Sequence, residues 1–213
     1  MCARYALFGP FSPGNLVPGF VEHVVNPLAG FAHYNIAPSL VNPVVVAGGS
    51  GPGLESMRWG LLPHWAKDPK IAYSTINARA ETLADKPAFR DAWRRGHRCI
   101  VPAECVYLPH YDEAGKATRW QVARADGAPM GIAGLWSLGW SHNGAPVPSF
   151  AMLTVNADDH PLMRTLHKPE DEKRMVVILD EADYEKWLNC PVEAMSGMMT
   201  RYPAASLTAE PAP

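Results

Sequence analysis

Cysteine at position 2 stands directly behind the initiator methionine. If Met1 is removed, Cys2 carries a free α-amine next to its thiol, and a terminal α-amine has a pKa of about 7.7–8.0. The amine can condense with an aldehyde to an imine, and the thiol can then close a five-membered thiazolidine ring. Taken alone, a cysteine at this position is more often incidental than reactive. The other residues must show whether Cys2 has a chemical role.

A second polar group stands in the stretch NARAET, where Asn77, Arg79 and Glu81 alternate with apolar residues. On a strand these three side chains share one face. An amide, a guanidinium and a carboxylate side by side can bind an anion and orient a reacting group. A solvated strand face explains the same pattern more simply.

Aromatic and basic residues occur together in RWGLLPHWAKD. Aromatic rings flanked by cations are typical of single-stranded nucleic-acid binding, because a base stacks on the ring and phosphates pair with the charges. We predict that Trp59 is a core residue. Trp65, which follows a proline and precedes Lys67, is the better candidate for exposure.

Two further segments carry basic residues. In FRDAWRRGHR, Arg90 and Arg94 are neighbours on one helix face, which fits a phosphate-binding stripe and a solvated face equally well. In DDHPLMRTLHKP, Arg164 lies between His160 and His167. A histidine in a loop can act as a general acid or base because its pKa lies near neutrality, although a single histidine is more often structural.

Composition limits the classes of function. The chain has 213 residues and a net charge of −2, so nucleic-acid binding would need a local basic patch. The four cysteines form no CxxC pair and no HExxH occurs, so we expect neither a metal nor another cofactor. A signal peptide and an apolar run of membrane-spanning length are both absent from the sequence. We expect a cytoplasmic monomer with reduced thiols and no membrane contact.

These side chains need a scaffold, and the sequence predicts one that is mainly β. Residues 8–20 indicate turns. Helices are predicted over 85–96, capped by Asp85 and ended by Gly96, and over 180–189. Strands are expected over 42–49, 54–63, 98–108, 117–124, 129–138, 149–157 and 174–180. Because the strands do not alternate with regular helices, we predict an α+β domain rather than a doubly wound parallel sheet.

Several motifs follow one another in an order that resembles the SOS response-associated peptidase (SRAP) family over roughly residues 1–190. They are Met-Cys at the start, RWGLLPHWAKD, NARAET, AFRDAWRRGHRCIVPAE, GLW, FAMLTVNA and HPLMRTLHKPEDEKRMVVIL. The resemblance implies a single α+β domain with a curved, mainly antiparallel β core and a positively charged groove. We place this domain at residues 1–195 and expect a flexible tail at 196–213.

The resemblance also implies a function and site residues. Family members sense abasic sites in single-stranded DNA, whose opened sugar presents an aldehyde, and they form a thiazolidine through the N-terminal cysteine after removing their own methionine. By this resemblance Cys2 is the nucleophile, Asn77 positions it, and His167 assists proton transfer. The residues expected to bind DNA are Arg4, Trp65, Arg79, Arg90 and Arg164, of which Arg90 rests on the helix pattern alone.

One position departs from the family pattern. Where the family shows a glutamate that moves protons, this chain has Leu108. Glu104 or His110 could substitute, and we include Glu104 among the candidate catalytic residues. Alternatively, the protein traps aldehydes with slower proton transfer, or it has become a pseudoenzyme.

We therefore predict a sensor of abasic sites that forms a covalent DNA–protein crosslink through Cys2, with autopeptidase and lyase-like activity. Single-stranded DNA carrying abasic sites is the expected partner, so the protein would associate with the bacterial nucleoid when bound. Two alternatives come from other classes. One is a noncovalent single-stranded-DNA-binding pseudoenzyme. The other is a thiol peptidase, acting on itself alone or on other proteins through a Cys2–His167 pair.

Overall fold

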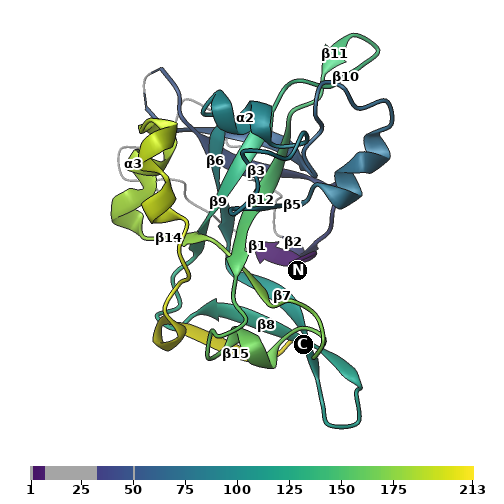
Figure 1. The fold of residues 1–213 in the computed structure, drawn as a ribbon, viewed down its shortest axis with the longest axis vertical. Coiled ribbons are helices and arrows are strands. Elements are labelled where there is room, and N and C mark those ends of the chain that lie inside the picture. Colours follow the sequence, from purple (N-terminus) through teal and green to yellow (C-terminus); the bar gives the residue numbers. More distant parts are fainter. Residues whose placement is uncertain (1, 8–32, 50) are drawn as a thin grey trace.

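The structure is a computed structural model that describes residues 2–7, 33–49 and 51–213. Two β-sheets form most of this part of the chain, with short helices at their margins (Figure 1). This confirms the predicted α+β class with a mainly antiparallel β core. The turn-rich segment 8–20 lies outside the described residues.

The larger sheet contains eight strands in the order β13-β12-β4-β3-β6-β9-β14, with β5 paired to β12. An additional pairing between β9 and β12 closes five of these strands into a ring, which explains the strong curvature. The strands are β3 (Val41–Val46), β4 (Gly53–Trp59), β5 (Asn77–Arg79), β6 (Arg98–Ala103), β9 (Met130–Ser137), β12 (Ser149–Asn156), β13 (Arg174–Val176) and β14 (Ile178–Leu179).

Both faces of β12 are buried, which is why its sequence is an apolar run rather than an alternating one. Its two parallel partners, β4 and β5, are exceptions in a sheet that is otherwise antiparallel. The parallel pairing with β5 fixes Asn77 opposite Met152 in the interior. The core therefore holds the NARAET segment in place.

The smaller sheet has the order β15-β8-β7-β1-β2, and all its pairings are antiparallel. Its strands are β1 (Tyr5–Leu7), β2 (His33–Ile36), β7 (Cys105–Tyr111), β8 (Ala117–Arg124) and β15 (Leu207–Pro211). A separate two-stranded ribbon joins β10 (Ser141–His142) to β11 (Ala145–Pro146). Because β1 lies between β7 and β2, the N-terminal residues are anchored inside a sheet (Figure 1).

The helices are short. They are α2 (Arg90–Arg94), α3 (Tyr184–Asn189) and the 3-10 helices η1 (Pro69–Ser74), η2 (Met163–Thr165), η3 (Glu181–Asp183), η4 (Val192–Ala194), η5 (Ser196–Met198) and η6 (Ala204–Ser206). The predicted helix over 85–96 is shorter than expected, since it begins after Phe89 without a side-chain cap from Asp85. Gly96 does end it, with a φ of 67° that suits glycine.

Two predicted strands are each divided in the structure. The run 98–108 breaks at Glu104, where the chain leaves the larger sheet and enters the smaller one. The run 174–180 breaks after Val176 because Val177 donates its N–H to Leu153. In both cases one apolar run supplies two strands with different pairing partners.

The expectation of a flexible tail over 196–213 is wrong for residues 207–211. These form β15, which pairs with β8 over its whole length and leaves Leu207 buried. Polar and proline-rich composition favours a frayed chain end. It gives no information about β8, whose edge would otherwise be unpaired. The last strand covers that edge.

Candidate functional site

Cys2 lies just before β1 and is 3 % exposed. Its Sγ donates a hydrogen bond to the carbonyl oxygen of Arg4 at 3.3 Å. Burial raises the pKa of the Cys2 thiol to about 12. Its sulfur is therefore protonated at neutral pH, and any reaction at this atom needs a group that takes the proton.

Asn77 contacts Cys2 directly. Its Nδ2 donates a hydrogen bond to the carbonyl oxygen of Cys2 at 2.5 Å. The side chain is buried, and its Oδ1 has no hydrogen-bond partner among the described residues. The contact joins β5 to the N-terminus across 75 residues of sequence, and the free Oδ1 can accept a hydrogen bond from a bound group.

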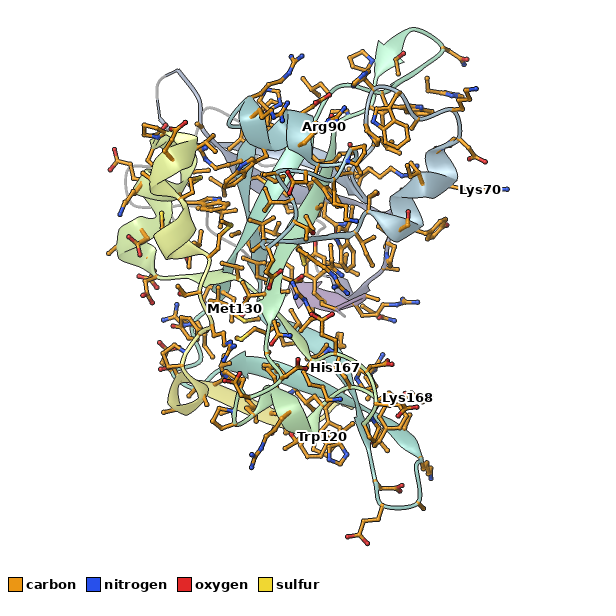
Figure 2. All side chains as sticks on the ribbon, viewed as in Figure 1. Lys70, Arg90, Trp120, Met130, His167 and Lys168 are labelled. Atoms are coloured by element: carbon orange, nitrogen blue, oxygen red, sulfur yellow. The ribbon has the colours of Figure 1, made fainter. Side chains whose placement is uncertain are left out.

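His167 follows η2 in a left-handed conformation with a φ of 69°. Its N–H donates to the carbonyl oxygen of Pro109 at 2.6 Å, which holds the residue against β7. Figure 2 labels its side chain beside the strands of the smaller sheet. A non-glycine residue rarely adopts this conformation, so contacts with the surrounding structure must hold it there.

The His167 ring is buried and uncharged at neutral pH. Among the described residues it is the one side chain with two buried polar atoms that lack a partner, Nδ1 and Nε2. Burial lowers its pKa to about 4, so the ring is neutral at pH 7 and one nitrogen can accept a proton. Buried polar atoms in a native fold normally have partners, so both ring nitrogens are free to bond a group that enters the site.

Leu108 lies where the departure from the family pattern matters most. It is 3 % exposed and lines a small cavity of about 10 Å³ together with Cys2. Among the other described residues that line this cavity, Arg174 is the polar one. The other lining residues are Val106, Val122, Met163, Met175, Val176 and Ile178. The cavity beside the thiol therefore contains no carboxylate among the described residues.

Glu104 is not beside Cys2. Its N–H donates to the carbonyl oxygen of Ala6 at 2.8 Å, toward the opposite end of β1. Four residues separate it from Leu108, a distance of roughly 13 Å along a strand. Burial raises the pKa of Glu104, but the register gives it no route to the thiol.

His110 is closer to the site, because it forms a β-bridge with Leu166, the residue before His167. Its ring stacks on Trp120 with the ring centroids 4.4 Å apart. The stack fixes the ring at the edge of the site. The described contacts show no hydrogen bond from His110 to Cys2.

The expected DNA-binding residues are all exposed at the surface and fall into two groups. Arg4, Arg79 and Arg164 belong to the segments that carry Cys2, Asn77 and His167. Arg4 donates to Oδ1 of Asn35, while Arg79 forms an ion pair with Glu172 at 2.8 Å. The structure therefore brings three guanidinium-bearing segments to the candidate site.

Trp65 and Arg90 form the second group. Trp65 is 45 % exposed, as predicted, and its Nε1 donates to the carbonyl oxygen of Pro87 at 3.3 Å. Arg90 opens α2 and pairs with Asp91, which also contacts His64. Trp59 is fully buried, which confirms the core prediction, and packs edge-to-face against Tyr5.

An open cleft of about 440 Å³ adjoins the thiol cavity. Ala3, Arg4 and Leu108 line it, together with Tyr107, Pro109, Ala117, Thr118 and Arg119. Leu108 lines both the cleft and the cavity, but its side chain packs with Cys2 on one face of β7, while Tyr107 and Arg119 line the cleft on the opposite face.

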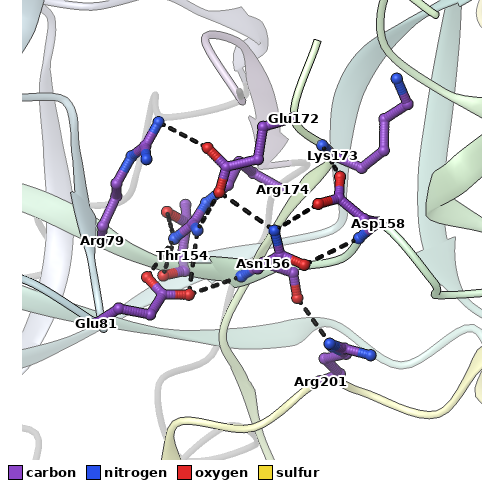
Figure 3. Close-up of polar contacts among 9 residues, drawn as sticks. All are labelled: Arg79, Glu81, Thr154, Asn156, Asp158, Glu172, Lys173, Arg174 and Arg201. Atoms are coloured by element: carbon purple, nitrogen blue, oxygen red, sulfur yellow. Dashed lines mark hydrogen bonds and ion pairs between the residues drawn. The ribbon is translucent and has the colours of Figure 1, made fainter. Parts of the chain in front are cut away.

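A polar network behind the site was missed by sequence reasoning (Figure 3). Arg174 is buried and donates to both carboxylate oxygens of Glu81, to Glu172 and to the Thr154 carbonyl oxygen. In the sequence, Arg174 is one charge within the run PEDEKR, and nothing there distinguishes it from a solvated residue. Only the pairing of β13 with β12 shows that it is buried.

The chain is similar to known proteins over most of its length. The family model described as SOS response associated peptidase (SRAP) matches residues 1–212. Abasic site processing protein YoaM of Bacillus subtilis is 33 % identical over 190 residues, covering 89 % of this chain and 79 % of YoaM. Abasic site processing protein HMCES of Xenopus tropicalis is 26 % identical, covering 84 % of this chain and 60 % of HMCES.

Solved structures show the same fold. A crystal structure of a Bordetella bronchiseptica protein superposes with a TM-score of 0.82 and 32 % identity, covering 100 % of both chains. A phage-related protein from the same organism superposes with a TM-score of 0.73 at 20 % identity, over 99 % of this chain and 94 % of that one. Within the described residues, three or more potential ligands do not gather at any point to hold a metal ion, and every helix is too short or too polar to cross a membrane.

Proposed function

This chain belongs to the SOS response-associated peptidase family, and from that premise we propose that it captures abasic sites in single-stranded DNA through Cys2. The observation that carries the proposal is the hydrogen bond from Asn77 to the Cys2 carbonyl oxygen, beside a buried neutral His167. The printed names of its relatives support the substrate class.

The chemistry begins with removal of Met1, which consumes one water and frees the Cys2 α-amine. The amine attacks the aldehyde carbon of the opened abasic sugar, and loss of one water gives an imine. The thiol sulfur then adds to the imine carbon, and its proton passes to the imine nitrogen. One C–N bond and one C–S bond have formed, and the net product besides the thiazolidine is one water.

The described side chains divide this work. Asn77 holds the Cys2 backbone, so the amine and thiol face a single position, and its free Oδ1 can accept a hydrogen bond from the sugar. His167 is neutral, and during ring closure it relays the thiol proton to the imine nitrogen. Holding the reacting groups in one geometry lowers the entropic part of the barrier.

Leu108 sets the rate at which this happens. A leucine cannot donate the proton that helps water leave the carbinolamine, and the cavity offers no carboxylate in its place. We propose that His167 alone moves protons, so crosslinking is slower than in a chain with glutamate at this position. Leu108→Glu would restore an acid, with a pKa raised by burial.

The test is a denaturing gel after incubation with single-stranded DNA that carries one abasic site. Wild type, Cys2→Ala and Leu108→Glu are compared, and intact masses report whether Met1 is present. An adduct from wild type, faster with Leu108→Glu and absent with Cys2→Ala, supports the proposal. An equal yield from Cys2→Ala would contradict it.

One observation favours a second candidate function, noncovalent binding of single-stranded DNA. The apolar cavity around Leu108 fits a site that has lost its proton-transfer group, while exposed Arg4, Arg79 and Trp65 remain. In that case Cys2→Ala leaves DNA affinity unchanged and wild type forms no adduct. Crosslinking by Leu108→Glu alone would identify this state.

A further inference from the structure

The loop between His167 and β13 is acidic and is held in a defined shape. Residues 170–172 are Glu, Asp and Glu. The Lys173 ammonium is mostly buried and donates to three carbonyl oxygens of this loop, those of Lys168, Pro169 and Asp171, at 2.6–2.8 Å. The backbone N–H of Lys173 also donates to Asp158. The carboxylates are therefore presented by a fixed backbone.

Glu172 is the loop carboxylate that reaches the candidate site. Its Oε2 accepts from Nη2 of Arg79 at 2.8 Å, and its Oε1 accepts from Nη1 of Arg174 at 2.9 Å (Figure 3). Asn156 donates to the same Oε1 at 3.3 Å. Burial alone would raise the pKa of Glu172, but the hydrogen bonds from Arg174 and Asn156 outweigh it and lower that pKa, so the group is ionised at neutral pH.

Arg79 is in a different situation. Its side chain is 49 % exposed, and Glu172 is its ion-pair partner among the described residues. A carboxylate and a phosphate present similar oxygens to a guanidinium, so the two compete for it. Arg174, by contrast, is buried under Glu81 and Glu172 and is closed to a phosphate.

We propose that Glu172 is a specificity-determining residue that occupies Arg79 as a mimic of a DNA phosphate. A passing strand must displace this carboxylate to gain one ionic contact. Noncovalent affinity for intact single-stranded DNA is thereby kept low, and retention depends on the covalent step at Cys2. The inference rests on the proposed function, because it assumes that Arg79 meets the DNA backbone.

The test measures affinity for an undamaged single-stranded oligonucleotide by fluorescence anisotropy at several salt concentrations. We expect Glu172→Gln to bind about threefold to tenfold more tightly than wild type, as when one exposed ion pair no longer competes. The slope of log affinity against log salt should become steeper by about 0.7, the value for one added contact on single strands. Melting temperatures check that each form is folded.

Two controls separate this mechanism from a general charge effect. Glu170→Gln removes the same charge from the same loop, but Glu170 pairs with Lys168 and not with Arg79. It should change affinity less than twofold. In an Arg79→Ala background, Glu172→Gln should give no gain, because the residue through which it acts is gone.

The outcomes distinguish this inference from the proposed function. Unchanged or weaker binding by Glu172→Gln, or the same gain in the Arg79→Ala background, overturns the inference while wild type still crosslinks abasic DNA. Absence of binding and crosslinking by every form contradicts the proposed function and the inference together.

Discussion

At the scale of single residues, Asn77 is the side chain that most directly positions the candidate nucleophile. Its hydrogen bond to the Cys2 carbonyl oxygen is buried, and losing such a bond costs roughly 1–3 kcal/mol. We expect Asn77→Ala to lower the single-turnover crosslinking rate at saturating DNA about tenfold or more, with little change in affinity. An unchanged rate would show that the bond is only structural.

His167 gives a prediction about pH. Its folded pKa of about 4 lies below the ordinary value of 6.5, so the unfolded chain binds more protons between these values. The stabilisation from this group is present above pH 6.5 and is lost as pH falls toward 4. His167→Asn removes the titrating ring and tolerates the left-handed backbone. Urea unfolding at pH 7 and 5 should show a smaller loss for the variant than for wild type. Equal losses would contradict a buried neutral ring.

Sequence reasoning at this scale found residues but not all of their relations. The positions of Cys2, Asn77 and His167 came from motif order, and the structure adds the direct contact between the first two. The alternation of side chains along a strand could not show whether Glu104 supplies the carboxylate that is missing at position 108. The register of β1 against β7 separates Glu104 from Cys2, and register depends on pairing partners distant in sequence.

At the scale of elements, the buried Arg98 holds α3 against the larger sheet. Its Nε donates to the Trp187 carbonyl oxygen at 2.6 Å, and its Nη2 donates to that of Cys190 at 2.5 Å. These carbonyls lie at the end of α3, where no intrahelical donor reaches them. In the sequence Arg98 appeared to extend a basic surface stripe, so its burial was not foreseen.

This placement predicts a stability difference between two neighbouring arginines. Arg98→Met leaves buried carbonyls unpaired and should lower the free energy of unfolding by about 2–3 kcal/mol. Arg95→Met, at the exposed end of α2, should change it by less than about 0.5 kcal/mol. Urea titration of both variants checks this, and similar effects from the two substitutions would refute the assignment.

Strands were easier to predict than helices in this chain. Apolar, β-branched runs gave β8, β9 and β12 with nearly correct bounds, because burial on a sheet imposes that composition. The predicted helix over 85–96 is longer than α2. Capping residues and prolines indicate where a helix can begin, but they do not show where packing requires a helix. Strand β15 was missed because its partner edge is a tertiary property.

At the scale of the whole molecule, the net charge of −2 gives no general attraction to DNA. We expect affinity for DNA to come from the arginines of the proposed DNA-binding set. If Arg4 and Arg164 each contact one phosphate while Glu172 occupies Arg79, log affinity of the wild type for single-stranded DNA should fall with log salt at a slope of about −1.4. Anisotropy titrations at several salt concentrations measure this. A slope near zero would exclude phosphate binding by these residues.

The central claim is that Cys2 forms a thiazolidine with the sugar of an abasic site. The most direct measurement is the intact mass of the denatured adduct between the protein and an oligonucleotide that carries one such site. The predicted mass is the sum of the oligonucleotide and the protein without Met1, less one water, and it should be absent with Cys2→Ala. An adduct that retains Met1, or one that forms equally with Cys2→Ala, would contradict the claim.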